Sequence, residues 1–159
     1  MPRPIGHITI AAVGKLREQH WQAAQEAYVH RLQHYTDFRL IEVRDVVGKA
    51  QPDAVAVARE GEHLLAAVPR GVRVVAMTAD GRKMTSPEMS DYLEAQLATY
   101  GELVFLIGGP LGIDPAVAAA APERLSLSPL TFTHEMARVI LLEQLYRAFT
   151  ILHGEPYHK

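Results

Sequence analysis

A chain of 159 residues, 48% of them apolar and 21% charged, has room for one domain with its own core, and these fractions argue against disorder, collagen and coiled coil. It has no cysteine, no apolar run approaching the roughly 20 residues of a membrane span and no signal-peptide core, so we expect a cytoplasmic protein without membrane contact. The formal net charge of −2 argues mildly against nonspecific nucleic-acid binding, and composition alone favours an enzyme acting on small molecules.

Strand and helix patterns alternate along the chain. Strands are predicted over 7–13, 38–43, 72–77, 103–107 and 124–127, and helices over 18–35, 53–68, 85–100, a short stretch from Asp114, and 134–153. Residues 78–81 are predicted to form a turn, Thr85 to cap the third helix, and Gly101 to end it. The alternation predicts a single α/β domain over 1–159, with a mainly parallel sheet and helices on both faces.

Three glycines follow the predicted strand 103–107, at Gly108, Gly109 and Gly112. Glycine has no Cβ and accepts positive φ, so this stretch permits a very close approach to the backbone. A tight strand-to-helix turn explains the glycines, and so does a ligand cleft, because open α/β sheets bind ligands at the carboxyl ends of their strands. The GxGxxG spacing of a dinucleotide site and the Lys-Ser/Thr of a P-loop are both missing, which argues against these two kinds of nucleotide site.

The segment 127–132, Leu-Ser-Pro-Leu-Thr-Phe, combines apolar and hydroxyl side chains. Its hydroxyls suit a loop that closes turns, and Thr133 suits the cap of the helix that follows. The same composition suits an adenine site, in which backbone groups bind the edge of the base and apolar side chains cover its faces. Both interpretations stay open for this segment.

The last predicted helix, 134–153, is apolar on nearly every side. A helix of this kind is usually buried, and in a small domain that favours a subunit interface. Its charged residues Glu143 and Arg147 are four apart, which predicts a plain intrahelical ion pair. Arg138 has no such local partner, and it is therefore the better functional candidate.

The helix is followed by Pro156, Tyr157, His158 and Lys159. Segments at chain ends are mostly frayed and without a role, but a polar segment held by a proline can also deliver titratable groups to a site. Histidine is the natural general base near neutral pH. The other histidines are scattered without ligand spacing, so we expect no metal site.

Four motifs occur in order along the chain: 106–112 (LIGGPLG), 125–131 (LSLSPLT), 145–148 (LYRA) and 156–159 (PYHK). Together they resemble the ribosomal RNA large subunit methyltransferase H family, small single-domain members of the SPOUT methyltransferases. The resemblance extends over almost the whole chain. It implies transfer of a methyl group from S-adenosylmethionine to the ring nitrogen N3 of a pseudouridine in 23S ribosomal RNA of the assembled ribosome. A shaped ribosomal substrate would reconcile RNA binding with a slightly acidic chain.

The same resemblance implies a fold whose carboxyl-terminal part is tied in a trefoil knot, one of the rare exceptions to unknotted topology. It also implies a homodimer with an active site shared between subunits. Carried over by position, the catalytic candidates are Arg138, Tyr157 and His158. The residues implied to bind the cofactor are Met77, Gly108, Gly109, Gly112, Leu127, Ser128, Pro129, Leu130, Thr131 and Phe132.

Three positions depart from the family pattern. Met77 stands where a leucine is usual, a volume-conserving exchange that a core tolerates. Residues 133–136, Thr-His-Glu-Met, replace a Pro-His-Pro-like segment, which leaves the start of the last helix open. The first few residues, including Pro2 and Pro4, resemble a short extension without a role.

Three other functions stay open. The first is a SPOUT enzyme that methylates transfer RNA, although the basic appendage domain that such enzymes need for free transfer RNA is missing. The second is a non-catalytic S-adenosylmethionine-binding factor associated with the ribosome, against which Arg138 and the complete Tyr157-His158 ending argue. The third is an unrelated phosphate- or nucleotide-binding α/β enzyme, the prediction that the residues give without the resemblance.

Overall fold

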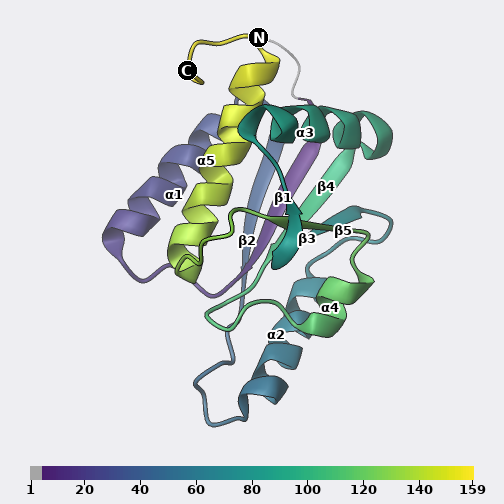
Figure 1. The fold of residues 1–159 in the computed structure, drawn as a ribbon. Coiled ribbons are helices and arrows are strands. Elements are labelled where there is room, and N and C mark those ends of the chain that lie inside the picture. The colour runs from purple at the N-terminus through teal and green to yellow at the C-terminus, as the bar shows by residue number, and fades with distance from the viewer. Residues whose placement is uncertain (1–4) are drawn as a thin grey trace.

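The computed structural model describes residues 5–159 and contains one five-stranded sheet flanked by five helices (Figure 1). Residues 1–4, part of the predicted extension, lie outside the described residues. The strands are β1 His7–Val13, β2 Asp37–Val43, β3 Arg73–Lys83, β4 Glu102–Ile107 and β5 Glu123–Ser126. The helices are α1 Gln19–Leu32, α2 Asp53–Ala66, α3 Ser86–Tyr100, α4 Pro115–Ala120 and α5 His134–Leu152.

The sheet has the strand order β2-β1-β4-β3-β5, and every neighbouring pair is parallel. The predicted α/β fold is confirmed. Alternate residues of the central strands serve two separate cores. Ile8 and Ile10 of β1 pack with leucines of α1, α3 and α5, whereas Ala11 and Val13 pack with Leu64 of α2 and Val117 of α4. Helices therefore cover both faces of the sheet, as its mostly apolar strands β1 and β4 require.

The predicted turn at 78–81 is wrong, because β3 continues through these residues to Lys83. The strand is irregular there, with a register shift between Met77 and Arg82 where it pairs with β5. Gly81 permits this pairing, since a Cβ on it would lie 2.7 Å from the backbone nitrogen of Leu125. Contact with β5 thus overrides the local turn signal. All predicted strands and helices are found, and apart from the carboxyl end of β3, which lies six residues beyond the prediction, their ends are displaced by at most three residues.

Local signals fix the ends of the two helices beside the site. The hydroxyl of Thr85 accepts a hydrogen bond from the backbone nitrogen of Glu88 at 3.2 Å, and Gly101 ends α3 in the left-handed conformation with φ of +75°. The hydroxyl of Thr133 accepts from the backbone nitrogen of Met136 at 3.3 Å, so the predicted cap of the last helix is also confirmed.

Helix α5 lies between α1 and α3 on one face of the sheet (Figure 1). Its side chains Leu141, Leu142, Leu145 and Phe149 are fully buried within the protomer, which accounts for much of its apolar composition without a second subunit. A partly exposed strip remains on the helix, made of Met136, Ile140, Glu143, Gln144 and Arg147. Neither α5 nor any other helix within residues 5–159 is long and apolar enough to cross a membrane.

Candidate active site

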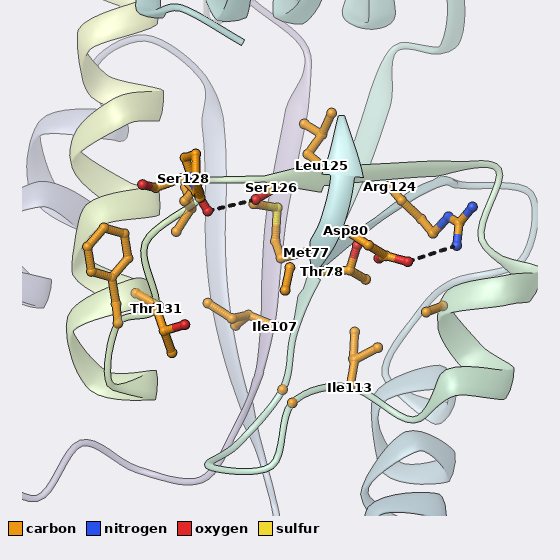
Figure 2. Close-up of a pocket in the computed structure, with 18 of the residues that line it drawn as sticks. Met77, Thr78, Asp80, Ile107, Ile113, Arg124, Leu125, Ser126, Ser128 and Thr131 are labelled. Carbon is orange, nitrogen blue, oxygen red and sulfur yellow. Dashed lines mark hydrogen bonds and ion pairs between the residues drawn. The ribbon is translucent and has the colours of Figure 1, made fainter. Parts of the chain in front are cut away.

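A cavity of about 480 Å³ opens at the carboxyl ends of β4 and β5, beside the irregular part of β3 (Figure 2). Met77 of β3, Ile107 of β4 and Leu125 of β5 form its strand-derived wall, and loops and the start of α5 complete it. A site at this edge of a parallel sheet is the expected place for a ligand. The full lining is Met77, Thr78, Ala79, Asp80, Ile107, Gly108, Gly112, Ile113, Pro115, Ala118, Arg124, Leu125, Ser126, Leu127, Ser128, Pro129, Leu130, Thr131, Phe132 and Ala137.

Nine of the ten residues predicted to bind the cofactor line this cavity; the exception is Gly109. A Cβ on Gly109 would point away from the lining, 3.3 Å from the side chain of Val13 and 3.6 Å from Oε1 of Glu60. Gly109 therefore belongs to the loop 108–112 but faces β1 and α2 instead of the cavity. The structure brings the two predicted segments, 108–112 and 127–132, to the same cavity although they are far apart in the sequence.

The glycine loop folds closely upon itself. The backbone nitrogen of Gly112 donates to the carbonyl of Gly109 at 2.9 Å, and Gly112 has φ of +81°. A Cβ on Gly108 would collide with the carbonyl carbon of Gly112 and lie 2.6 Å from the backbone nitrogen of Ile113. The close approach predicted from the glycines is thus made by the loop's own backbone. Any larger residue at position 108 would reshape the rim before it met a ligand.

The hydroxyl of Ser128 in the loop 127–132 and that of Ser126 just before it shape this loop. Ser126 donates through its hydroxyl to the carbonyl of Ser128 at 3.1 Å, and the backbone nitrogen of Leu130 donates to the hydroxyl of Ser128 at 3.0 Å. The turn-closing role predicted for Ser128 is confirmed. Leu130 at the mouth of the cavity is 73% exposed, an unusual position for a leucine.

A second cavity of about 280 Å³ shares a wall with the first. Both are lined by Met77, Leu125, Ser126, Leu127 and Phe132. The second continues toward α3 and α5, where its lining adds Arg82, Met84, Thr85, Ser86, Met89, Ile140, Leu141 and Gln144. Sequence reasoning missed it. The only available signal was the grouping of three methionines, which suit adaptable apolar surfaces.

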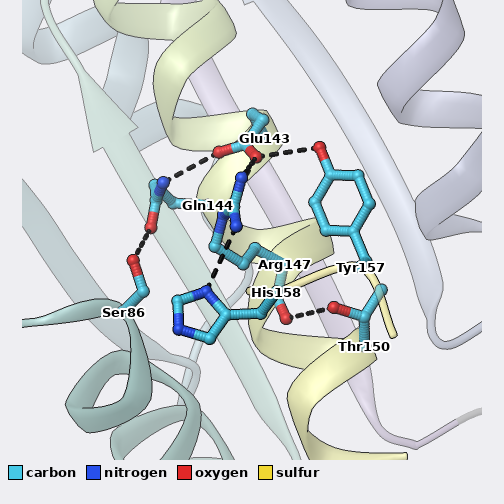
Figure 3. Close-up of polar contacts among 7 residues, drawn as sticks. All are labelled: Ser86, Glu143, Gln144, Arg147, Thr150, Tyr157 and His158. Atoms are coloured by element: carbon cyan, nitrogen blue, oxygen red, sulfur yellow. Dashed lines mark hydrogen bonds and ion pairs between the residues drawn. The ribbon is translucent and has the colours of Figure 1, made fainter. Parts of the chain in front are cut away.

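The segment 156–159 does not fray but folds back along α5 (Figure 3). The hydroxyl of Tyr157 donates to Oε1 of Glu143 at 2.9 Å, and Arg147 donates to the same oxygen at 2.6 Å and 3.1 Å. Arg147 also donates to Nδ1 of His158 at 3.2 Å and lies 4.7 Å from the centre of the Tyr157 ring. The predicted Glu143–Arg147 pair is confirmed, and it additionally holds both candidate residues of the segment.

Protonation in this cluster follows from its contacts. Burial, and then the hydrogen bond to Glu143, raise the pKa of Tyr157 well above its ordinary value, so the phenol keeps its proton near neutral pH. The hydrogen bond to Glu143 raises the pKa of Arg147. Because Arg147 donates to Nδ1 of His158, that nitrogen has no proton, and a neutral ring then carries its proton on Nε2. The basic nitrogen of His158 is occupied while the segment is docked.

Arg138 lies apart from both cavities, with only 2% of its side chain exposed. It donates to Oε2 of Glu42 at 2.6 Å and to the carbonyls of Val13 and Gly14 at 3.0 Å and 2.8 Å. Burial lowers the pKa of its guanidinium, and the hydrogen bond to Glu42 opposes this shift. The nine residues that separate it from Arg147 span about 13 Å of helix. Arg138 ties α5 to the carboxyl ends of β1 and β2.

A sequence model of the family described as predicted SPOUT methyltransferase matches residues 7–158. The chain belongs to the SPOUT methyltransferase family. Similar curated relatives are named ribosomal RNA large subunit methyltransferase H. The protein of Bacillus pumilus (strain SAFR-032) is 40% identical over 159 residues, and that of Ruminiclostridium cellulolyticum (strain ATCC 35319 / DSM 5812 / JCM 6584 / H10) is 42% identical over 160 residues. Each alignment covers 96% of this chain and 99% of the relative.

Solved structures support the SPOUT fold of this chain. A probable methylase family protein from Haemophilus influenzae Rd KW20 has a TM-score of 0.55 at 15% identity, covering 96% of this chain and 70% of its own. A probable methyltransferase from Bordetella pertussis Tohama I has a TM-score of 0.55 at 14% identity, covering 94% and 99%. The trefoil knot that the family resemblance implies stays a prediction.

The larger cavity is also lined by residues that the sequence analysis did not single out. Ile107 and Ser126 end their strands at the cavity, so the rule on strand ends could have found them. Asp80 and Arg124 gave no local signal, because they are 44 positions apart and Asp80 was assigned to a turn.

Within residues 5–159 no three His, Asp or Glu side chains gather as a group that could hold a metal ion.

Proposed function

We propose that this protein transfers a methyl group from S-adenosylmethionine to N3 of a pseudouridine in 23S ribosomal RNA of the assembled ribosome. Membership of a methyltransferase family supports the reaction, and the names of the relatives support large-subunit ribosomal RNA as the substrate. The observation that carries the proposal is the pair of adjoining cavities. One is large enough for a cofactor, and the other leads from it to Gln144, next to the Glu143 that holds Tyr157.

The larger cavity fits the methyl donor. Its volume of about 480 Å³ is within the usual range for ligand sites, and its lining is mostly apolar with a few polar groups. We assign the adenosine part to the uncharged loop 127–132 and to the rim formed by Gly108 and Gly112. When bound there, the donor supplies an electrophilic methyl group on a sulfonium, and the protein's task is alignment of donor and acceptor.

We assign the acceptor base to the smaller cavity. Leu127 and Phe132 line both cavities, so donor and acceptor would meet where the two cavities adjoin. The far side offers hydrogen-bonding groups: the hydroxyl of Ser86 donates to Oε1 of Gln144 at 2.6 Å, and Nε2 of Gln144 donates to Glu143 at 2.8 Å. This chain of contacts joins the base site to the carboxylate that holds the segment 156–159.

The acceptor nitrogen of an imide carries a proton and is a poor nucleophile until that proton leaves. We assign its removal to Nδ1 of His158, directly or through water. Since Arg147 occupies this nitrogen in the docked segment, proton transfer requires the segment to move off α5 over bound RNA. Arg147 is then free to stabilise the developing anion, a role that suits it better than the enclosed Arg138.

A homodimer remains part of the proposal. The smaller cavity is lined by Ile140 and Gln144, which belong to the partly exposed strip of α5. A second subunit docked on this strip would close the cavity and exclude water from the acceptor. Size-exclusion chromatography with light scattering tests this arrangement, because Ile140→Glu should convert a dimer to a monomer.

Radiolabelled methyl transfer to substrates that lack the modification tests the function. Assembled ribosomes, isolated large subunits and transfer RNA are compared, and the product is identified by nucleoside analysis. A methylated pseudouridine from ribosomes, with no product from transfer RNA, is expected. His158→Ala should lower turnover by about 100-fold while cofactor affinity is unchanged, and His153→Ala is the matched control. Tight cofactor binding without transfer to any ribosomal particle would overturn the proposal and favour a binding factor.

A further inference from the structure

The larger cavity has one charged corner. Among the described residues that line it, Asp80 and Arg124 are the only two with charged side chains. Figure 2 shows them together on one side of the cavity, with Ser128 and Thr131 of the loop 127–132 on the other side. The cavity therefore has an uncharged end and an end that presents one anion and one cation.

The irregularity of β3 creates this corner. Met77 and Lys83 pair with β5 on either side of the register shift, and Asp80 lies between them. Arg124 belongs to the facing part of β5. The close packing of Gly81 on the backbone of Leu125 keeps the bulged part of β3 against β5. Residues that looked like a turn in the sequence thus place a carboxylate beside a guanidinium at the rim.

The ion pair between Asp80 and Arg124 has the geometry of one that adds little to the stability of the fold. Nη1 of Arg124 is 3.9 Å from Oδ2 of Asp80, and the two side chains are 49% and 78% exposed. Exposed pairs of this length contribute little to stability. Arg73 and Glu123, another ion pair between β3 and β5, contrast with it: they are 3.2 Å apart and only 22% and 26% exposed, and Gln96 bonds to both.

We propose that Asp80 and Arg124 bind the amino-acid end of the methyl donor, with Arg124 on its carboxylate and Asp80 on its ammonium group. The inference rests on the proposed function, which supplies the donor. An adenosine moiety is uncharged and matches the loop 127–132, whereas the amino-acid end carries one charge of each sign. Guanidinium binds carboxylate through two parallel hydrogen bonds, and the loose contact with Asp80 leaves those donors available.

Two probes that differ only at this end test the assignment by calorimetry. S-adenosylhomocysteine has the amino-acid group, and methylthioadenosine lacks it. Wild-type protein is expected to bind the former more tightly. Arg124→Gln and Asp80→Asn should each weaken S-adenosylhomocysteine binding by about ten-fold and change methylthioadenosine binding by less than about two-fold. Arg73→Gln is the matched control and should leave the ratio of the two affinities unchanged.

The outcomes separate this inference from the function on which it rests. If both probes bind and the two cavity variants weaken them equally, or weaken neither, the charged corner does not hold the amino-acid end and the inference is overturned. If wild-type protein binds neither probe, the cofactor assignment itself falls and the inference falls with it. Selective loss of S-adenosylhomocysteine in both variants, with Arg73→Gln unaffected, supports the inference.

Discussion

Two arginines near opposite ends of α5 differ in burial, in hydrogen-bond partners and in the direction of their pKa shifts. Arg138 is buried on α5, and its donors go to the carboxylate of Glu42, the side chain of Gln25 and the carbonyls of Val13 and Gly14. Arg147 is 24% exposed, and its donors go to Glu143 and His158. Burial lowers the pKa of the first, whereas the carboxylate raises the pKa of the second. The enclosed arginine joins α5 to β1 and β2, and the more accessible one joins α5 to the segment 156–159.

The largest expected effect is on stability. Arg138→Leu should lower the free energy of unfolding by about 3 kcal/mol or more, because Glu42 loses its cation and two carbonyls lose their donors. Arg147→Leu should cost less than about 1 kcal/mol, since its partners remain accessible to water. Urea denaturation of both variants measures the difference. Equal losses would contradict the division of roles.

The next effect is on turnover. Arg147→Leu should reduce methyl transfer by about 10- to 100-fold at saturating cofactor, because the developing anion loses the guanidinium assigned to stabilise it. Arg147→Lys should recover part of the activity, since a lysine still pairs with Glu143 but cannot make both bonds to it. A turnover number equal to wild type in Arg147→Leu, with ribosomes in excess, would refute the role of Arg147 in stabilising the anion.

A smaller effect tests whether Arg138 acts through its charge. Adding Glu42→Leu to Arg138→Leu should recover about 1–2 kcal/mol of the stability lost by the single variant, because no carboxylate is then left without its cation. The double variant is compared with both single variants in the same urea titration. A strictly additive loss would mean that packing, and not the ion pair, holds this part of α5.

The smallest effect is a dependence on pH. The pKa of Tyr157 is higher in the folded protein than the ordinary value of about 10. The stability that its hydroxyl contributes is therefore complete below about pH 10 and is lost as pH rises through the folded-state pKa. Phenolate absorbance of wild type minus Tyr157→Phe should show a midpoint above pH 10. A midpoint at or below 10 would mean that the segment is not docked on Glu143 in solution.

Features set by a few neighbouring residues were predictable from the sequence. Thr85 and Thr133 cap their helices and Gly101 ends α3, because each needs only its own conformation and the next turn. The two loops of the larger cavity were also predictable, since carboxyl ends of parallel strands gather ligand sites and the family motifs fall at those ends.

Features made by distant residues were not predictable. Arg138 has no partner on its own helix, and its carboxylate comes from a strand 96 positions earlier. Residues 78–81 carry the composition of a turn, but contact with β5 keeps them in a strand. The docking of Tyr157 depends on a reversal at Gly154, where φ is +66°, and no spacing along the helix reveals it. In each case a contact between distant parts of the chain determines the structure, and the neighbouring residues alone do not.

The strand order has a consequence for synthesis. Strand β3 lies between β4 and β5, both of which follow it in the chain, so none of its neighbours in the sheet exists when it is made. At elongation rates of about 5–20 residues per second, the residues that separate β3 from β4 take about 1–4 s to add. During that interval the apolar strand has two open edges, a state prone to wrong pairing. A ribosome translating this chain therefore carries an intermediate with unpaired strand edges until β4 emerges.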